Sequence, residues 1–72
     1  MTPMTFALFD VVILTKDMPE DGLKAGMKGA VVDVHTKPTL AYEVEFCDGS
    51  GRTIALLALL PDYLKLDKSA TT

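Results

Sequence analysis

The chain has 72 residues, of which 49% are apolar, and its seven lysines and arginines against ten aspartates and glutamates give a formal net charge of −3. A chain this short forms one small domain, and its apolar burial barely offsets the entropy lost on ordering, so the fold must be economical or supported by a partner. A single cysteine excludes an internal disulfide, and with a single histidine it argues against a four-ligand structural zinc site. The acidic balance argues against general nucleic-acid binding, which depends on lysines and arginines that neutralise phosphates.

The chain also lacks the signs of export or membrane insertion. It has no charged start followed by an apolar core and a cleavage site, so we expect no signal peptide. The longest apolar run, residues 54–60, is far shorter than the roughly 20 residues that span a bilayer. Together with the unpaired Cys47, these features predict a soluble cytoplasmic protein that does not contact the membrane.

Both ends of the chain are small, polar and aperiodic. We expect residues 1–5 to be a flexible N-terminus and residues 67–72 a flexible tail, around one domain at residues 6–66. The first predicted strand is 10–15 (DVVILT), which is rich in β-branched residues. Residues 16–29 follow as a long structured loop, because their proline disrupts a helix and their three glycines permit turns.

Three more strands follow in close succession. Residues 30–35 (AVVDVH) predict a strand, and residues 36–39 (TKPT) predict a turn. Residues 41–47 (AYEVEFC) show the clearest alternation in the chain, with two aromatic residues and a valine inward and two glutamates outward. The glycine-containing segment 48–51 (DGSG) then predicts a β-hairpin to a strand at 52–60 (RTIALLALL).

The last elements complete the predicted fold. Residues 61–64 (PDYL) predict a single 3₁₀ turn, and residues 64–66 (LKL) predict a final short strand. About five short strands at this spacing indicate an all-β fold, a small SH3-like barrel with a 3₁₀ turn before its last strand. The competing reading places residues 54–60 on a helix, since alanine and leucine are strong helix formers.

The residues that could carry chemistry are better explained by structure. Cys47 and His35 are expected at opposite ends of a hairpin, and Cys47 shares a face with Glu43 and Glu45, whose charges disfavour a thiolate. Residues 48–51 lack the further ligands and flanking helices of a calcium loop. The two glutamates match a solvated strand face, because a barrel this small offers no deep cleft. We therefore expect no enzyme, no cofactor and no metal site.

The more informative feature is a surplus of apolar residues. We assign Ile54 and Leu56 to the core, which leaves alternate leucines of the same strand outward. The apolar residues expected on the outer surface are Val11, Ile13, Leu57 and Leu59. The polar residues expected around them are Asp33, Glu43, Glu45 and Arg52, with Arg52 paired to Glu45 across the strands. Such a patch, together with a free edge strand, is typical of an interface with another protein or a second copy.

Three segments of the chain together resemble a bacterial family, domain of unknown function 4926. They are residues 8–34 (LFDVVILTKDMPEDGLKAGMKGAVVDV), 42–59 (YEVEFCDGSGRTIALLAL) and 62–66 (DYLKL). The resemblance covers about residues 6–66 and implies a small SH3-like barrel without established enzyme activity, with a toxin–antitoxin or immunity role as one expectation. A fainter similarity to the barrel of nitrile hydratase β subunits, through spaced loop glycines before an apolar strand, implies a protein-docking role.

Three functional hypotheses follow. The first is a non-enzymatic protein–protein interaction module that docks on a partner or forms a homodimer. The second is an acidic, antitoxin- or immunity-like inhibitor whose loop at residues 17–21 (DMPED) attracts a cationic partner. The third, a nucleic-acid-binding barrel, requires four lysines to gather on one face despite the net charge. Those lysines are Lys16, Lys24, Lys28 and Lys37.

Overall fold

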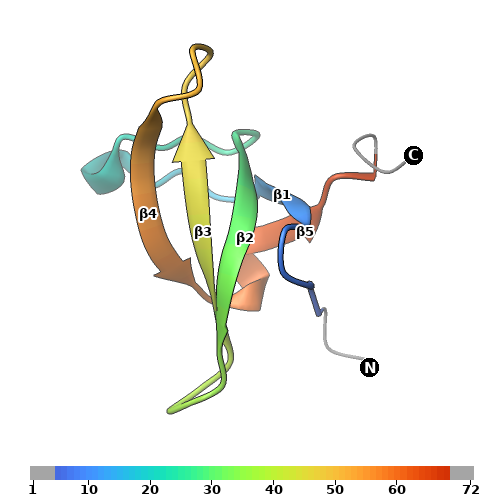
Figure 1. Ribbon diagram of the computed structural model, residues 1–72. Helices are drawn as coiled ribbons and strands as arrows, with labels where there is room; N and C mark the ends of the chain where they lie inside the picture. The colour runs from blue at the N-terminus through green and yellow to red at the C-terminus, as the bar shows by residue number, and fades with distance from the viewer. Residues whose placement is uncertain (1–4, 69–72) are drawn as a thin grey trace.

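The computed structural model describes residues 5–68, which form one five-stranded antiparallel sheet and two short 3₁₀ helices (Figure 1). The elements in chain order are β1 (Val11–Leu14), η1 (Pro19–Asp21), β2 (Lys28–His35), β3 (Ala41–Cys47), β4 (Thr53–Leu59), η2 (Pro61–Tyr63) and β5 (Leu64–Leu66). The predicted all-β fold, with a 3₁₀ turn before its last strand, is confirmed. Of the two ends predicted to be flexible, residues 1–4 and 69–72 lie outside the described part of the chain.

The sheet is open rather than closed into a ring. Its strand order is β4-β3-β2-β1-β5, so β4 and β5 are the two edges and do not pair with each other. Figure 1 shows β2, β3 and β4 side by side at the front, with β1 and β5 behind them. The sheet therefore folds over on itself, and the core lies between its two halves.

The side chains that face this space form a single apolar core. Its buried members are Phe6, Val12, Leu14, Leu23, Val31, Tyr42, Val44, Phe46, Leu59 and Leu64. The predicted alternation of β3 is confirmed, since Tyr42, Val44 and Phe46 are each at most 1% exposed. The Tyr42 hydroxyl accepts a hydrogen bond of 3.1 Å from the Phe6 backbone N–H, and the two rings meet edge to face. The segment before β1 is thereby fixed over one end of the core.

Strand β2 does not follow strict alternation. Its pairing with β3 shifts between Val31 and Asp33, which makes Val32 an extra residue at a β-bulge. Val31 then lies opposite Val44, and Val34 lies opposite Tyr42, so both valines are on the core side although three positions separate them. Strict alternation along residues 30–35 predicts that these two valines lie on opposite faces, and that prediction is wrong because the bulge changes the parity of the strand.

The long loop between β1 and β2 folds back on itself. Met18 and Leu23 form an isolated antiparallel bridge, with η1 at the tip and Gly22 in the left-handed conformation at φ 71°. Leu23 reaches into the core and is 1% exposed. At the base of the loop, the Thr15 backbone N–H donates to the Tyr63 carbonyl at 2.8 Å. The loop is thus tied to both the core and η2, as the prediction of a structured loop requires.

Candidate interaction surface

The two faces of β4 are the reverse of those predicted. Leu59 lies opposite Tyr42 and Leu57 opposite Val44, so both leucines face the core. Leu59 is 4% exposed, and Leu57 is half-buried against the core. The prediction that these leucines lie on the outer surface is therefore wrong. Because β3 turns its aromatic residues inward, its partners across the ladder must face inward as well.

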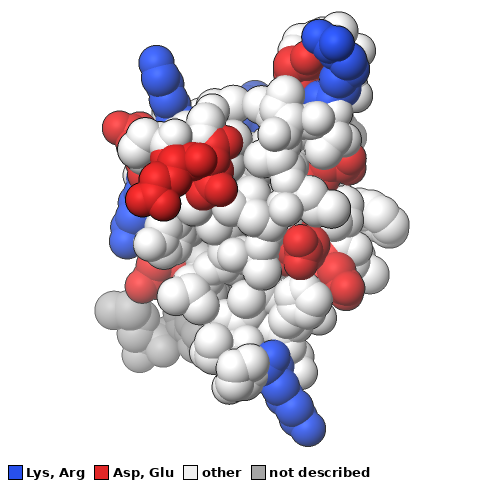
Figure 2. Space-filling view, turned by 90° about the vertical axis from the view of Figure 1, so that its left-hand side faces the viewer, with Lys and Arg blue, Asp and Glu red and all other residues white. Residues whose placement is uncertain are grey.

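The outer face of β4 instead carries the residues that were assigned to the core. Ile54 is 45% exposed and Leu56 is 56% exposed, and Ala58 beside them is also exposed. Leu60, directly after the strand, is 46% exposed. Figure 2 looks onto this side of the molecule and shows an uncharged surface running along it, with carboxylates on both margins. We call Ile54, Leu56, Ala58 and Leu60 the β4 patch.

The β4 patch continues into the outer face of the sheet. The register places Val11, Ala30, Glu45 and Leu56 opposite one another in a row that crosses β1, β2, β3 and β4. Val11, Ala30 and Glu45 also line a shallow depression of about 230 Å³, together with Lys28, Gly29 and Cys47. Val11 and Glu45, both predicted interface residues, therefore lie on one continuous surface with Leu56.

Ile13, the other outward residue predicted in β1, lies between two lysines. It is opposite Lys28 of β2 and Lys65 of β5, and it is half-buried. The alternation predicted for β1 is confirmed, because Val12 and Leu14 are buried. Ile13 is therefore not in the row that connects Val11 to Leu56, and the two lysines stand on either side of it.

The predicted acidic residues lie beside the patch on the same outer face. Glu43 is opposite Ala58 on one side and opposite Asp33 on the other. Its Oε1 is 2.9 Å from His35 Nε2, and the Glu45 carboxylate accepts a hydrogen bond from the Thr53 hydroxyl. These contacts hold the carboxylates over β3, where they form a polar border to the apolar surface of β4.

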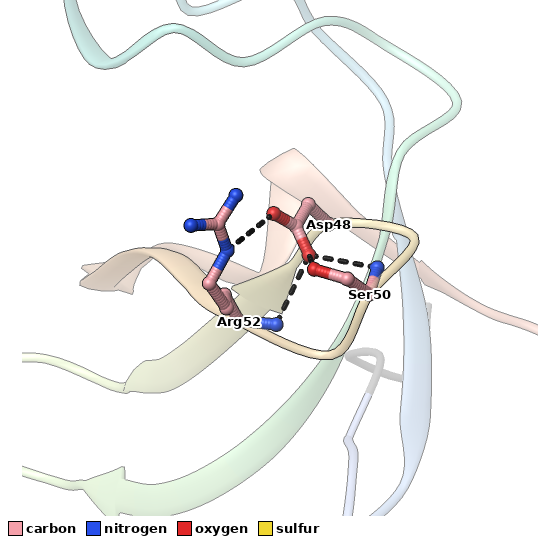
Figure 3. Close-up of polar contacts among 3 residues, drawn as sticks. All are labelled: Asp48, Ser50 and Arg52. Atoms are coloured by element: carbon pink, nitrogen blue, oxygen red, sulfur yellow. Dashed lines mark hydrogen bonds and ion pairs between the residues drawn. The ribbon is translucent and has the colours of Figure 1, made fainter.

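Arg52 has a different partner from the one predicted. Its Nε donates to Asp48 Oδ2 at 3.3 Å, at the tip of the β3–β4 hairpin, rather than to Glu45 (Figure 3). Asp48 Oδ1 accepts from the Ser50 hydroxyl at 2.7 Å and from the backbone N–H groups of Ser50 and Arg52. The Ser50 hydroxyl, followed by these backbone donors, lowers the pKa of Asp48 below its usual value. Arg52 thus belongs to a turn that organises the hairpin.

The acidic loop reaches the same side of the molecule as β4. The tip of the loop, η1, lies beyond β4 in Figure 1. It carries Glu20 and Asp21, both exposed, while Asp17 Oδ1 accepts from the Ala25 backbone N–H at 2.8 Å. Asp17, Glu20 and Asp21 also line a shallow depression of about 240 Å³ with Met18, Pro19 and Tyr63. The carboxylates of this loop therefore form a second acidic region near the β4 patch, in addition to Glu43 and Glu45.

A second group of exposed apolar residues, Leu8 and Phe9, was not predicted from the sequence. Leu8 is 51% exposed and Phe9 is 76% exposed, just before β1. Phe9 has a φ of 70°, which is rare for an aromatic residue, and its N–H donates to the Val31 carbonyl at 2.7 Å. The pair therefore lies beside β2, on the other side of β3 from the β4 patch. Consecutive large apolar residues next to an aspartate turn are the only sequence signal for it.

Residues with reactive side chains are not gathered into a site. His35 lies opposite Ala41 at one end of β3, and Cys47 ends the strand at the other, as predicted. Within residues 5–68, no group of three histidine, cysteine or acidic side chains is placed to hold a metal ion. In the same residues, no helix has the length and apolar character needed to cross a membrane.

These features define a small, open-sheet β-domain with an uncharged apolar edge strand bordered by carboxylates. More particularly, the chain belongs to the family described as Domain of unknown function (DUF4926), whose model matches residues 8–66. The resemblance drawn from the sequence is thus confirmed at the level of the family. Neither the curated proteins nor the solved structures contain a match to this chain.

Proposed function

We propose that this domain is a non-enzymatic protein–protein interaction module and that the β4 patch is its docking surface. The observation that carries the proposal is the exposure of Ile54 and Leu56, at 45% and 56%, on the outer face of an edge strand. Single exposed leucines are common on soluble proteins, but a contiguous apolar strip at a sheet edge marks an interface.

Strand β4 also lacks the residues that usually prevent an edge strand from pairing with another chain. Soluble β-proteins commonly protect an edge strand with lysine, proline or an inward-pointing charge. The segment from Thr53 to Leu60 has no charged residue and no proline, and its only irregularity is the shift of register beside Cys47. An exposed apolar edge of this kind promotes aggregation, so its presence here supports a partner that covers it.

A matched pair of substitutions tests the proposal. Leu56→Lys places a charge in the β4 patch, whereas Leu8→Lys makes the same change at a leucine of similar exposure, 51%, beside β2. Tagged chains are expressed in native cells, and the proteins that they retain are quantified by mass spectrometry. We expect a partner retained by the wild type and by Leu8→Lys, and reduced about tenfold or more by Leu56→Lys.

Light scattering on the same three purified proteins reports whether the partner is a second copy. A strict monomer whose retained proteins are the same for all three chains would contradict the proposal. Loss of the partner with Leu8→Lys alone would move the docking surface to Leu8 and Phe9.

A second candidate function is inhibition of a cationic partner, in the manner of an antitoxin or immunity protein. It is supported by the exposed Glu20 and Asp21 on the same side of the molecule as the β4 patch, which would steer a basic protein toward that surface. The double change Glu20→Lys and Asp21→Lys is expected to slow association with such a partner, whereas Asp62→Lys on η2 serves as the control. Equal association rates for both variants would count against it.

Nucleic-acid binding has the least support of the three functions. Lys28 Nζ is 3.0 Å from Asp67 Oδ2, and Lys16 Nζ lies 4.6 Å from the centre of the Tyr63 ring. Both lysines therefore have intramolecular contacts that compete with phosphate.

We also propose that the interaction module is a cytoplasmic protein. Cys47 is an exposed free cysteine, and such a thiol stays reduced in the cytoplasm.

A further inference from the structure

We infer that β4 receives an added β-strand from a basic partner protein, in which apolar residues alternate with lysine or arginine. This inference rests on the proposed function and specifies the chemistry of the partner. In the added strand, the cationic side chains lie on the outer face of the sheet, and the apolar side chains point toward the core. Three features of β4 support this arrangement.

The first feature is the free backbone edge. Because β4 pairs only with β3, one side of its backbone has no strand partner within residues 5–68. Its seven residues, Thr53–Leu59, present an edge about 23 Å long at roughly 3.3 Å per residue. Addition of a strand satisfies the outward N–H and C=O groups of such an edge, and its side chains then determine which partner binds.

The second feature is the open side of the core. Because β4 and β5 do not pair with each other, the sheet does not enclose the core beyond β4. Ala55 and Leu57 face the core there but are only half-buried. The inward residues of an added strand would cover them, which is why those positions of the partner should be apolar.

The third feature is the charge on the outer face. Glu43 is opposite Ala58, and Glu45 is opposite Leu56. An added strand lies roughly 10 Å from β3, two strand spacings away. A lysine or arginine there can lay its aliphatic stem over Leu56, or across the small Ala58, and bring its charge toward the glutamates. Glu43 and Glu45 already contact His35 and Thr53, but a carboxylate accepts several hydrogen bonds.

A second copy of this chain fits the edge less well. Contact along about 23 Å by the roughly 10 Å thickness of a sheet gives on the order of 230 Å² per partner, against about 800 Å² in a stable interface. A twofold interface also brings together two molecules that each carry a net charge of −3, with their acidic β3 strands about 14 Å apart, at three strand spacings. Edge contact of this area is too small for a stable dimer, but it is the same for any added strand, so the charge is what favours a basic segment over a second copy.

Synthetic peptides test the inference on the full chain. The probe is a blocked nine-residue peptide that alternates lysine and valine, titrated into isotope-labelled protein and followed by backbone amide NMR. One control peptide replaces each lysine with glutamate. A second control carries N-methyl groups on alternate residues, so that it retains the charge but cannot complete the strand ladder. Leu56→Lys and Leu8→Lys are the matched protein variants.

We expect the lysine peptide to shift the amides of Thr53–Leu59, with slowed hydrogen exchange at every second one. Affinity should fall about tenfold or more for the glutamate peptide, for the N-methylated peptide, and for the lysine peptide with Leu56→Lys. Leu8→Lys should bind as the wild type does. Each tenfold change corresponds to about 1.4 kcal/mol.

Four results would overturn the inference: no saturable binding, shifts that map away from β4, equal binding of either control peptide, or a dimer that depends on Leu56. These results remain separate from the proposed function. If Leu56→Lys releases the native partner while the lysine peptide does not bind, the module stands and strand addition is wrong. If the peptide binds but no native partner depends on Leu56, the interaction module is wrong.

Discussion

Gly29 is the position at which a single methyl group should damage this fold most directly. It lies in β2 between Val12 of β1 and Phe46 of β3, and it is buried. A Cβ at Gly29 would come within 2.6 Å of Val44 Cγ1, 2.9 Å of the Glu45 carbonyl oxygen and 3.0 Å of Phe46 Cδ1. The side-chain atoms can rotate away only into a packed core. The Glu45 oxygen belongs to the backbone of the central strand, so the two strands must separate locally.

Gly29→Ala is therefore expected to lower the free energy of unfolding by about 1–3 kcal/mol, the usual cost of forcing an extra carbon into a packed site. For a domain of this size, each 1 kcal/mol corresponds to about 4–8 °C in Tm, so a decrease of at least about 4 °C should be measurable. Urea denaturation and thermal melting, both followed by circular dichroism, give the two quantities independently.

Gly49→Ala is the matched control, because a Cβ at Gly49 has no atom within 4 Å. Its free energy of unfolding should stay within about 1 kcal/mol of the wild type, and it can rise slightly as the unfolded chain loses freedom. The reasoning is refuted if Gly29→Ala is as stable as the wild type, or if both glycine variants lose the same amount.

Three further predictions concern the core and the hairpin. Tyr42→Phe should cost about 1–2 kcal/mol in urea denaturation, because it leaves the Phe6 N–H without its acceptor; an unchanged midpoint would contradict this. Leu59→Ala should cost about 2–5 kcal/mol and Leu56→Ala well under 1 kcal/mol, and the reverse order would restore the face assignment made from the sequence. The pKa of Asp48 in the folded protein lies below its ordinary value of 3.8, so its stabilising charge is fully present above that pH and is lost as the pH falls through the folded value. Melting of Asp48→Asn should therefore differ from the wild type at neutral pH and converge with it in strong acid, whereas a constant difference would show that the charge is irrelevant.

Local pattern was sufficient for the strands that have one apolar and one polar face. β3 was predicted at its observed bounds, 41–47, because its two glutamates alternate with three large apolar residues. β5 was also predicted correctly at 64–66, since the proline at 61 ends the preceding strand. β2 begins at Lys28, two residues earlier than predicted. Its glycine indicated a loop, but pairing with Val12 and Phe46 on both sides holds Gly29 in the sheet.

The orientation of β4 required the pairing register, which hydrophobicity alone does not supply. Both faces of this strand are apolar, so neither is marked as the inner one. The hairpin itself contained the missing signal: a symmetric loop at 48–51 sets Phe46 opposite Thr53, which turns every second residue from Thr53 inward. In the structure Phe46 pairs with Ala55, so the faces from Ala55 onward agree with this parity. The shift of register places Thr53 opposite Cys47 instead, on the outer face with Glu45. The bulge at Val32 had no comparable signal, because Val31 and Val32 are identical consecutive residues and nothing in the sequence marks one of them as the extra residue.

Reversing β4 changes which residues a partner would meet. With Leu57 and Leu59 outward, the apolar surplus would be part of a broad outer face, and Ile54 with Leu56 would complete the core. In the structure, Leu59 completes the core beside Tyr42, and Ile54 with Leu56 are left at the free edge. An apolar strip at an edge differs from one on a face, because the backbone beside it also lacks partners. The exposed apolar side chains and the unpaired backbone groups therefore occur together on β4. One added strand would cover the side chains and bond to the backbone groups, whereas a partner packed flat on the outer face would leave the backbone groups unpaired.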